Sequence, residues 1–360
     1  MNAPQYARSS AAPVHYGLTV AKNRIAVIGG DGIGPEVTAE ALNVVRAAGV
    51  EIDTVDFDLG AGRYVRTGDV LPDEVLDELR GFDAILLGAI GPPIGSTDVP
   101  SGILERGLLL KLRFALDLYA NVRPFTGVPG SIAATADFVV VRENTEGAYA
   151  GEGGFLRKGT PDEVATQGSV NTRRGVERCI RYAMGLAMTR PRRRLTMVHK
   201  TNVLTFAGDL WSRTLDAVAA DYPDITVSYQ HADAACIYLA TNAEQYDVIV
   251  TDNLFGDILT DLAGAVTGGI GFAASANLNP GAETPSLFEP VHGAAHDIAG
   301  TGKANPLAAI RSAAMMLDHL GETDAARRIT QAVVELQNEA SGLNELSTTQ
   351  IGAAIVQRLG

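Results

Sequence analysis

Two aspartates, Asp257 and Asp261, lie four residues apart in the segment Thr-Asp-Asn-Leu-Phe-Gly-Asp-Ile-Leu-Thr-Asp. In a helix they share one face, where two carboxylates repel each other unless a positive charge lies between them. Carboxylate oxygens at this spacing suit Mg²⁺ or Mn²⁺, which would keep waters and accept substrate oxygens as well. The alternative is a pair of acidic residues near a helix N-terminus, stabilised there by the helix dipole.

Three arginines precede this segment in the chain. Arg113 lies in a predicted helix over 104–120, and Arg123 follows that helix. Arg142 ends an apolar strand, so its side chain is expected to point into a crevice. Guanidinium groups bind carboxylates in a bidentate manner, so three of them suit a substrate with two carboxylates. Each arginine taken alone is equally explained by a surface salt bridge.

Two further side chains could move protons. Lys200 follows a predicted strand, and a lysine whose neutral form is favoured by burial or by neighbouring cations is a candidate general base. Tyr149 lies beyond Arg142 in the chain and is a candidate proton donor. The alternatives are a surface lysine and a packed aromatic ring.

A segment of small residues at 292–306 could bind a cofactor. It lets the backbone approach a flat or phosphorylated ligand, and Asp297 could bind two ribose hydroxyls. Asn305 and Pro306 predict the N-cap and first residue of a helix, so the alternative is merely a loop and a cap. The glycines at 30–34 are no evidence for NAD, because the dinucleotide fingerprint needs a third glycine where Pro35 stands.

Length and composition limit the class of protein. With 360 residues the chain can form two lobes, each with its own core. A net charge of −13 argues against nucleic acid or an anionic membrane as partner, so an anionic substrate needs a local cluster of cations. Cys179 and Cys236 lie outside any CxxC motif and fit ordinary thiols in a reduced, cytoplasmic compartment. No apolar run could span a membrane, and residues 1–22 are expected to form a flexible extension.

Predicted strands and helices alternate along the chain, which indicates an α/β fold with a largely parallel sheet. A stretch at 150–172 breaks this alternation and predicts an extended arm. Helices are predicted at 35–49, 71–81, 104–120, from 253 and from 305. Strands are predicted at 24–28, 51–59, 84–88, 138–142, 195–199 and 247–251.

These clusters occur together, in this order, in one family. The chain resembles the β-decarboxylating dehydrogenases, which include 3-isopropylmalate, isocitrate, homoisocitrate and tartrate/D-malate dehydrogenases, from about residue 25 to its last residue. The resemblance is carried by Gly-Asp-Gly-Ile-Gly-Pro-Glu at 30–36, Asn-Leu-Phe-Gly-Asp-Ile-Leu-Thr-Asp at 253–261 and Glu-Pro-Val-His-Gly at 289–293.

The resemblance implies the two-lobed isocitrate/isopropylmalate dehydrogenase-like fold, which is not a Rossmann fold, in an obligate homodimer with shared active sites. It implies a large NAD-binding lobe formed by 23–118 and 268–360. The small dimerisation lobe, 119–267, would carry the arm at 150–172. The expected cofactors are NAD and Mg²⁺ or Mn²⁺, and the expected partner besides the second subunit is a small 3-substituted malate.

The resemblance also implies roles for individual residues. The residues expected to bind the malate carboxylates are Arg113, Arg123 and Arg142. The expected metal ligands are Asp257, Asp261 and, from the partner subunit and also near the substrate, Asp233. The acid–base positions are Tyr149 and, again from the partner, Lys200. The adenosine-binding loop would comprise His292, Gly293, Asp297, Ile298 and Asn305.

An aliphatic helix face favours the isopropylmalate branch of this family. Leu108, Leu109 and Leu110 place apolar surface where isocitrate enzymes bind a third carboxylate, and burying an unpaired charge there is costly. Glu105 is also typical of the branch. The activity implied is NAD-dependent oxidative decarboxylation of (2R,3S)-3-isopropylmalate to 2-oxo-4-methylpentanoate, a step of leucine biosynthesis.

Two departures from the isopropylmalate branch keep alternatives open. The chain has Glu-Asn-Thr-Glu-Gly at 143–147 where many of these enzymes have Glu-Leu-Thr-Gly-Gly, and His296 stands where proline is usual. The alternatives are a tartrate/D-malate or homoisocitrate dehydrogenase, or a specialised paralogue acting on another 3-substituted malate. A catalytically inactive regulatory subunit is disfavoured, because every predicted ligand is present.

Overall fold

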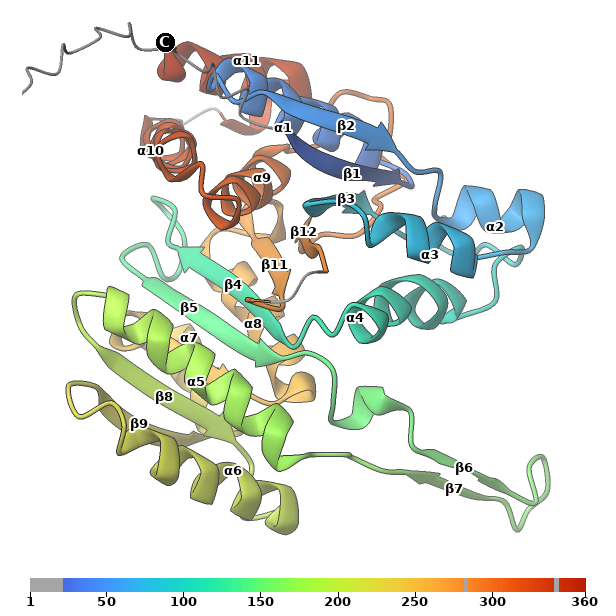
Figure 1. The fold of residues 1–360 in the computed structure, drawn as a ribbon, viewed down its shortest axis with the longest axis vertical. Coiled ribbons are helices and arrows are strands. Elements are labelled where there is room, and N and C mark those ends of the chain that lie inside the picture. The colour runs from blue at the N-terminus through green and yellow to red at the C-terminus, as the bar shows by residue number, and fades with distance from the viewer. Residues whose placement is uncertain (1–21, 282–283, 340–342) are drawn as a thin grey trace, which may run out of the picture.

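The computed structural model describes residues 22–281, 284–339 and 343–360. One sheet of ten strands runs through the molecule with helices on both of its faces (Figure 1). The strand order is β2-β1-β3-β12-β11-β4-β5-β10-β8-β9. The strands are β1 (Asn23–Gly30), β2 (Ile52–Asp56), β3 (Ala84–Ala89), β4 (Ala120–Thr126), β5 (Asp137–Glu143), β8 (Arg194–His199), β9 (Thr226–His231), β10 (Val248–Thr251), β11 (Ala274–Leu278) and β12 (Ser286–Pro290).

The helices vary from single turns to seventeen residues. The α-helices are α1 (Gly34–Ala47), α2 (Ala61–Thr67), α3 (Asp73–Leu79), α4 (Lys111–Ala115), α5 (Arg173–Thr189), α6 (Thr205–Ala219), α7 (Ala232–Thr241), α8 (Asn253–Thr267), α9 (Leu307–His319), α10 (Thr323–Glu339) and α11 (Thr348–Leu359). A π-helix, η1 (Glu105–Leu110), leads directly into α4, and short 3₁₀ turns are η2 (Ala148–Ala150), η3 (Ala243–Gln245), η4 (Ile270–Phe272) and η5 (Leu343–Glu345).

Two antiparallel strands divide the sheet into parallel halves. β11 runs antiparallel to β12 and β4, and β4 runs antiparallel to β5. All other pairings are parallel. Because β5 and β10 are parallel neighbours, their carboxyl ends meet at one edge of the sheet, where Arg142 and the start of α8 follow. The predicted α/β class is therefore confirmed.

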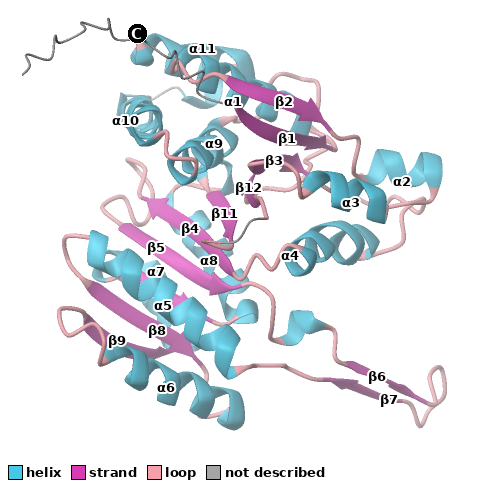
Figure 2. Ribbon diagram, viewed as in Figure 1, coloured by secondary structure: helices cyan, strands magenta, loops and turns pink. Residues whose placement is uncertain are grey.

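Each half of the sheet is covered on both faces (Figure 2). Helices α1, α9, α10 and α11 share one apolar core with the half formed by β2, β1, β3 and β12, while α3 and α4 pack on its other face. In the second half, α7 and α8 cover one face, and α5 and α6 cover the other. The predicted lobe boundaries after residues 118 and 267 stay a prediction.

Most predicted elements are present, with one clear error. The helix predicted over 104–120 ends at Ala115, because Asp117 adopts φ 51° and the amide of Leu118 turns back to the carbonyl of Arg113 at 2.8 Å. This reversal starts β4, which the sequence pattern did not predict. Pro124 is tolerated inside β4 because pairing with β11 stops at Val122, so no ladder bond is lost there.

The arm predicted at 150–172 is a hairpin of β6 (Gly153–Leu156) and β7 (Val164–Gln167), which extends from the body of the molecule (Figure 1). All eight strand residues are exposed, including Phe155 and Leu156. The predicted N-terminal extension lies outside the described residues except for Lys22. In the part of the chain that is described, no helix is both long and apolar enough to cross a membrane.

Candidate active site

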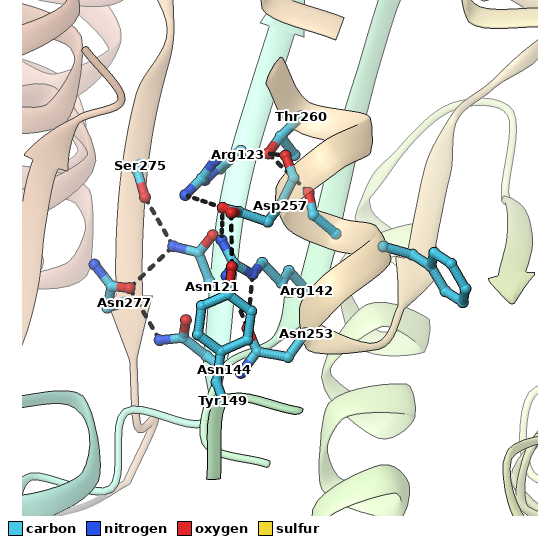
Figure 3. A network of polar contacts seen from close by, with 12 residues as sticks. Asn121, Arg123, Arg142, Asn144, Tyr149, Asn253, Asp257, Thr260, Ser275 and Asn277 are labelled. Atoms are coloured by element: carbon cyan, nitrogen blue, oxygen red, sulfur yellow. Dashed lines mark hydrogen bonds and ion pairs between the residues drawn. The ribbon is translucent and has the colours of Figure 1, made fainter. Parts of the chain in front are cut away.

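Arg142, the last but one residue of β5, is held against the first turns of α8 (Figure 3). Its Nε and Nη2 donate to Asn253 Oδ1 at 3.0 and 2.8 Å, and its Nη1 donates to the Asp257 carboxylate. A Cβ on residue 256 would lie 2.5 Å from Arg142 Cγ, so Gly256 is what lets the arginine pass so close to α8. The side chain is 1 % exposed, so it is held rigidly.

Arg123 and Arg113 flank Arg142. Arg123 Nη1 donates to Thr260 Oγ1 at 2.6 Å, and its Nη2 lies 4.0 Å from Asp257 Oδ1. Arg113 Nη2 donates to Glu289 Oε1 at 3.1 Å. Burial, together with the charges of Arg142 and Arg113, lowers the pKa of Arg123 to about 10, and its buried Nε has no hydrogen-bond partner in the part of the chain that the structure describes.

The cluster thus contains three buried guanidinium groups and two carboxylates, Asp257 and Glu289, that pair with them. Buried cations without a full set of counter-ions are costly, and each guanidinium retains donors suited to a carboxylate. The arrangement is therefore able to bind an anion with more than one carboxylate.

Tyr149, on η2, completes this side of the site. Its hydroxyl donates to Asp257 Oδ2 at 2.7 Å, and the Arg142 guanidinium carbon lies 5.1 Å from its ring centroid. Burial and the hydrogen bond to Asp257 raise the pKa of Tyr149, so the hydroxyl keeps its proton at neutral pH. Tyr149 is therefore able to act as a proton donor.

The two candidate metal ligands on α8 differ in their surroundings. Burial alone would raise the pKa of Asp257, but Arg142, Tyr149 and Arg123 outweigh it and lower that pKa. Asp261, one turn further on, is exposed, and partial burial together with the charge of Asp257 raises its pKa. Two carboxylates facing the same space are oxygen donors of the kind that Mg²⁺ and Mn²⁺ take.

Lys200 and Asp233 are paired elsewhere. Lys200 Nζ lies 2.6 Å from Asp233 Oδ1, which lowers the pKa of Asp233. Among the described residues, no three His, Cys, Asp or Glu side chains lie close enough to hold one metal ion. A single copy of the chain therefore does not bring Asp233 to Asp257 and Asp261.

The predicted cofactor loop borders a cleft of about 580 Å³, whose lining includes Gly91, Glu105, Ala294, His296 and Asp297. The 30–34 motif supports this loop: the amide of Ile33 donates to the carbonyl of Ala294 at 2.8 Å. Only glycine fits at position 32, because φ is +56° and a Cβ would lie 1.9 Å from that carbonyl oxygen.

The other residues of the predicted loop lie close by. His292 is buried and its Nε2 has no hydrogen-bond partner among the described residues, so a donor or acceptor on a ligand would satisfy it. Ile298 packs against the core, and Gly293 is exposed. Helix α9 begins at Leu307, just after the predicted start, and Asn305 Oδ1 accepts from the amide of Leu307 at 3.0 Å.

The leucines of the predicted pocket helix are divided between core and site. Leu104, Leu108, Leu112 and Leu116 are at most 1 % exposed and recur every fourth residue. In a regular α-helix such a stripe drifts by about 40° per step, and the wider turn of η1 (Glu105–Leu110) compensates for this drift. Leu109 is half-buried, as is its neighbour Leu110, whereas the expectation that Leu108 supplies pocket surface is wrong.

The site also contains residues that the sequence patterns did not single out. Asn277 Nδ2 donates to Glu289 Oε1 at 2.8 Å. Asn277 Oδ1 accepts from Asn121 and Asn144 at 3.0 and 2.9 Å (Figure 3). These amides fix Glu289, which in turn holds Arg113. Asn121 lies on β4, Asn277 lies on β11, and Asn144 directly follows β5. The sequence signal that could have pointed to them is the presence of polar residues within or beside buried strands.

A family model described as isocitrate/isopropylmalate dehydrogenase matches residues 24–355. The chain belongs to this family. Relatives named 3-isopropylmalate dehydrogenase include those of Corynebacterium glutamicum, 59% identical over 345 residues, and Thermobifida fusca, 57% identical over 348. These alignments cover 93% of this chain and 99% and 97% of the two relatives.

Comparison with solved structures also shows that this chain has the fold of the isocitrate/isopropylmalate dehydrogenase family. The crystal structure of isocitrate dehydrogenase from Methylococcus capsulatus matches with a TM-score of 0.84 and 39% identity. The match covers 94% of this chain and 99% of the other. The mixed α/β architecture described above is thus that of the family.

In this family member, the two departures noted in the sequence have structural partners. Asn144 Nδ2 donates to the carbonyl of Leu118 at 2.9 Å as well as to Asn277. Glu146 accepts from the amide of Thr172 at 2.7 Å and so secures the start of α5. His296 Nε2 lies 2.7 Å from the carbonyl oxygen of Gly91, across the cleft. These contacts give all three residues structural roles.

Proposed function

We propose that this chain is an NAD-dependent 3-isopropylmalate dehydrogenase, which converts (2R,3S)-3-isopropylmalate to 2-oxo-4-methylpentanoate and CO₂ in leucine biosynthesis. The proposal depends above all on the cluster of three buried guanidinium groups that faces only two carboxylates. It is supported by family membership and by the names of the curated relatives.

Substrate binding is assigned to Arg113, Arg123 and Arg142. The two malate carboxylates supply the anions that these cations lack, and bidentate contacts fix their orientation. The isopropyl group would pack against Leu109 and Leu110, whose half-buried side chains lie on the same helical segment as Arg113. A third carboxylate at that position would be left without a partner, which disfavours isocitrate-like substrates.

The residues present fit a divalent cation. Asp257 and Asp261 would hold it with Asp233 of a second copy, which brings three carboxylates together where one copy supplies two. A bound Mg²⁺ or Mn²⁺ would act as a Lewis acid that stabilises negative charge on the substrate oxygen at C2. In the described structure the charges of Asp257 and Lys200 are each balanced by a protein partner, Arg142 and Asp233 respectively.

The cleft beside 291–298 suits the adenosine end of NAD. The nicotinamide ring of the bound cofactor would supply the hydride acceptor for C2 of the substrate. The unpartnered Nε2 of His292 offers a contact, and the exposed Asp297 carboxylate is able to bind the ribose hydroxyls. Gly293, Ile298 and Asn305 complete the assigned loop.

Two side chains are assigned to proton transfer. Lys200, in its neutral amine form, would take the proton of the C2 hydroxyl during oxidation, and the Tyr149 hydroxyl would supply a proton at C3 after CO₂ has left. Tyr149 is held for this by its bond to Asp257 and by the adjacent Arg142 guanidinium.

We further propose that two copies form a homodimer with shared sites. Lys200 and Asp233 pair with each other and not with the arginine cluster of their own copy. Exposed apolar residues lie on the same half of the molecule, among them Phe206 at 92 % and Ile237 at 63 % exposure. Two-fold symmetry would cover this surface and bring each Lys200–Asp233 pair to the opposite arginine cluster.

The experiment that tests the activity compares 3-isopropylmalate, D-malate and homoisocitrate with NAD and Mg²⁺. The expected result is a kcat/KM at least about tenfold higher for 3-isopropylmalate, because its isopropyl group packs against the aliphatic surface of Leu109 and Leu110. A higher kcat/KM for D-malate or homoisocitrate would contradict the substrate assignment while leaving the family intact.

A further inference from the structure

The backbone around Lys200 forms a tight turn between β8 and α6. The carbonyl of Lys200 accepts from the amides of Val203 and Leu204 at 3.0 and 2.8 Å. The carbonyl before Lys200 belongs to His199, and the amide after it belongs to Thr201. These two groups flank the residue to which proton transfer is assigned.

Both flanking groups bond to a single side chain on the neighbouring edge strand, β9. The hydroxyl of Tyr229 lies 3.2 Å from the carbonyl oxygen of His199 and 3.2 Å from the amide nitrogen of Thr201. It also lies 3.0 Å from Thr201 Oγ1 and 2.7 Å from His231 Nδ1. Tyr229 reaches this position because β8 and β9 are parallel, with Met197 opposite Tyr229.

The hydrogen-bonding capacity of a phenol determines how these contacts are arranged. A tyrosine hydroxyl has one proton to donate and two lone pairs that accept. The His199 carbonyl only accepts and the Thr201 amide only donates, so the hydroxyl is able to satisfy both at once. The remaining lone pair is able to accept from the Nδ1–H of His231 or from the hydroxyl of Thr201. Tyr229 thereby brackets Lys200 on both sides along the chain.

The opposite side of the turn is fixed by close packing. A Cβ on Gly208 of α6 would lie 2.6 Å from Thr201 Cα and 2.9 Å from its Cβ. The turn therefore cannot move toward α6, and Tyr229 restrains it from the β9 side. Lys200 projects from a segment that is held on two sides.

We propose that Tyr229 is a positioning residue for Lys200, which it holds in place through the backbone without contacting substrate. The inference rests on the proposed function in one respect, the assignment of Lys200 to proton transfer. Because an error of 1 Å in a reacting group can cost about a hundredfold in rate, a looser turn lowers turnover strongly. The arginines and the cofactor loop are not involved, so binding is unaffected.

The test uses Tyr229→Phe, which removes only the hydroxyl, in the full-length dimeric protein. Tyr246→Phe is the matched control, because its hydroxyl donates to Gln230 of β9 and, among the described residues, forms no hydrogen bond with the Lys200 turn. For Tyr229→Phe we expect kcat to fall about tenfold while the KM values for 3-isopropylmalate and NAD stay within about twofold. For Tyr246→Phe we expect kcat close to that of the wild type.

A second readout is independent of the substrate. Hydrogen exchange of the Thr201 amide, followed by mass spectrometry of a peptide across 198–204, is expected to be about fivefold faster in Tyr229→Phe, because one hydrogen bond is lost. If the wild type turns over no 3-isopropylmalate, the proposed function fails, and the exchange rate still decides whether Tyr229 restrains the Lys200 turn. Unchanged exchange, unchanged kcat, or a joint change of kcat and both KM values would overturn the positioning role.

Discussion

A shared active site predicts that two inactive variants restore activity when they are combined. Lys200→Ala removes the proton-transfer residue, and Arg113→Ala removes a substrate ligand. In the structure the Lys200–Asp233 pair lies apart from the cluster that Arg113 and Glu289 form. If each site takes Arg113 from one copy and Lys200 from the other, a mixed dimer has one site with both lesions and one with neither.

The size of the recovery follows from counting. Random reassortment makes about half of the dimers mixed, and each mixed dimer has one intact site of two, so activity approaches roughly a quarter of the wild type. Arg113→Ala removes the guanidinium that donates to Glu289, but the fold is expected to persist because Asn277 still donates to that carboxylate.

The assay measures NADH formation after co-expression of differently tagged subunits and two-step purification of the mixed dimer. Each parent variant, carried through the same procedure, is the control. Verified mixed dimers with no activity above either parent would refute the reasoning, because Lys200 would then act within its own copy.

Three further predictions concern the cofactor, the metal and the pocket helix. The kcat/KM with NAD should be roughly a hundredfold higher than with NADP, because the 2′-phosphate of NADP would be repelled by the Asp297 carboxylate. Equal values would contradict the assignment of Asp297 to ribose binding. Asp257→Asn should require more Mg²⁺ for half-maximal activity while its thermal midpoint stays near that of the wild type; full activity of the wild type after thorough chelation would contradict the metal role. The buried residues Leu104, Leu108, Leu112 and Leu116 are four residues apart, and deleting Leu110 shortens the middle interval to three residues. A regular α-helix places residues at intervals of four, three and four on one face. The shortened protein should therefore fold with a thermal midpoint close to the wild type, and an unfolded product would contradict the explanation of η1.

The parts of the fold that the sequence predicts are those with continuous local patterns. β1, β3, β5, β8 and β10 each contain consecutive buried residues that are mostly apolar, and such runs are recognisable in the sequence. β4 and β11 carry Asn121, Ser275 and Asn277, which are buried but bonded to one another. Polar residues in a strand interior are stabilised only by partners distant in sequence, so no local pattern predicts these strands.

The candidate site also has a part that the sequence predicts and a part that it does not. The spacing of Asp257 and Asp261 predicts a shared helical face, and the resemblance groups Arg113, Arg123 and Arg142. Their protein partners could not be predicted, because the bond from Arg113 to Glu289 spans 176 positions of the chain. The wider turn of η1 is not among the predicted elements, although buried leucines that recur every fourth residue are the pattern that indicates it.

The proposed activity joins oxidation and decarboxylation of 3-isopropylmalate in a single catalytic cycle. The most direct test incubates the purified protein with 3-isopropylmalate, NAD and Mg²⁺ and quantifies NADH, CO₂ and the 2-oxo acid together. We expect equal amounts of NADH, CO₂ and the 2-oxo acid, with 2-oxo-4-methylpentanoate as the acid. NADH without CO₂, a different 2-oxo acid, or no turnover would contradict the proposed activity.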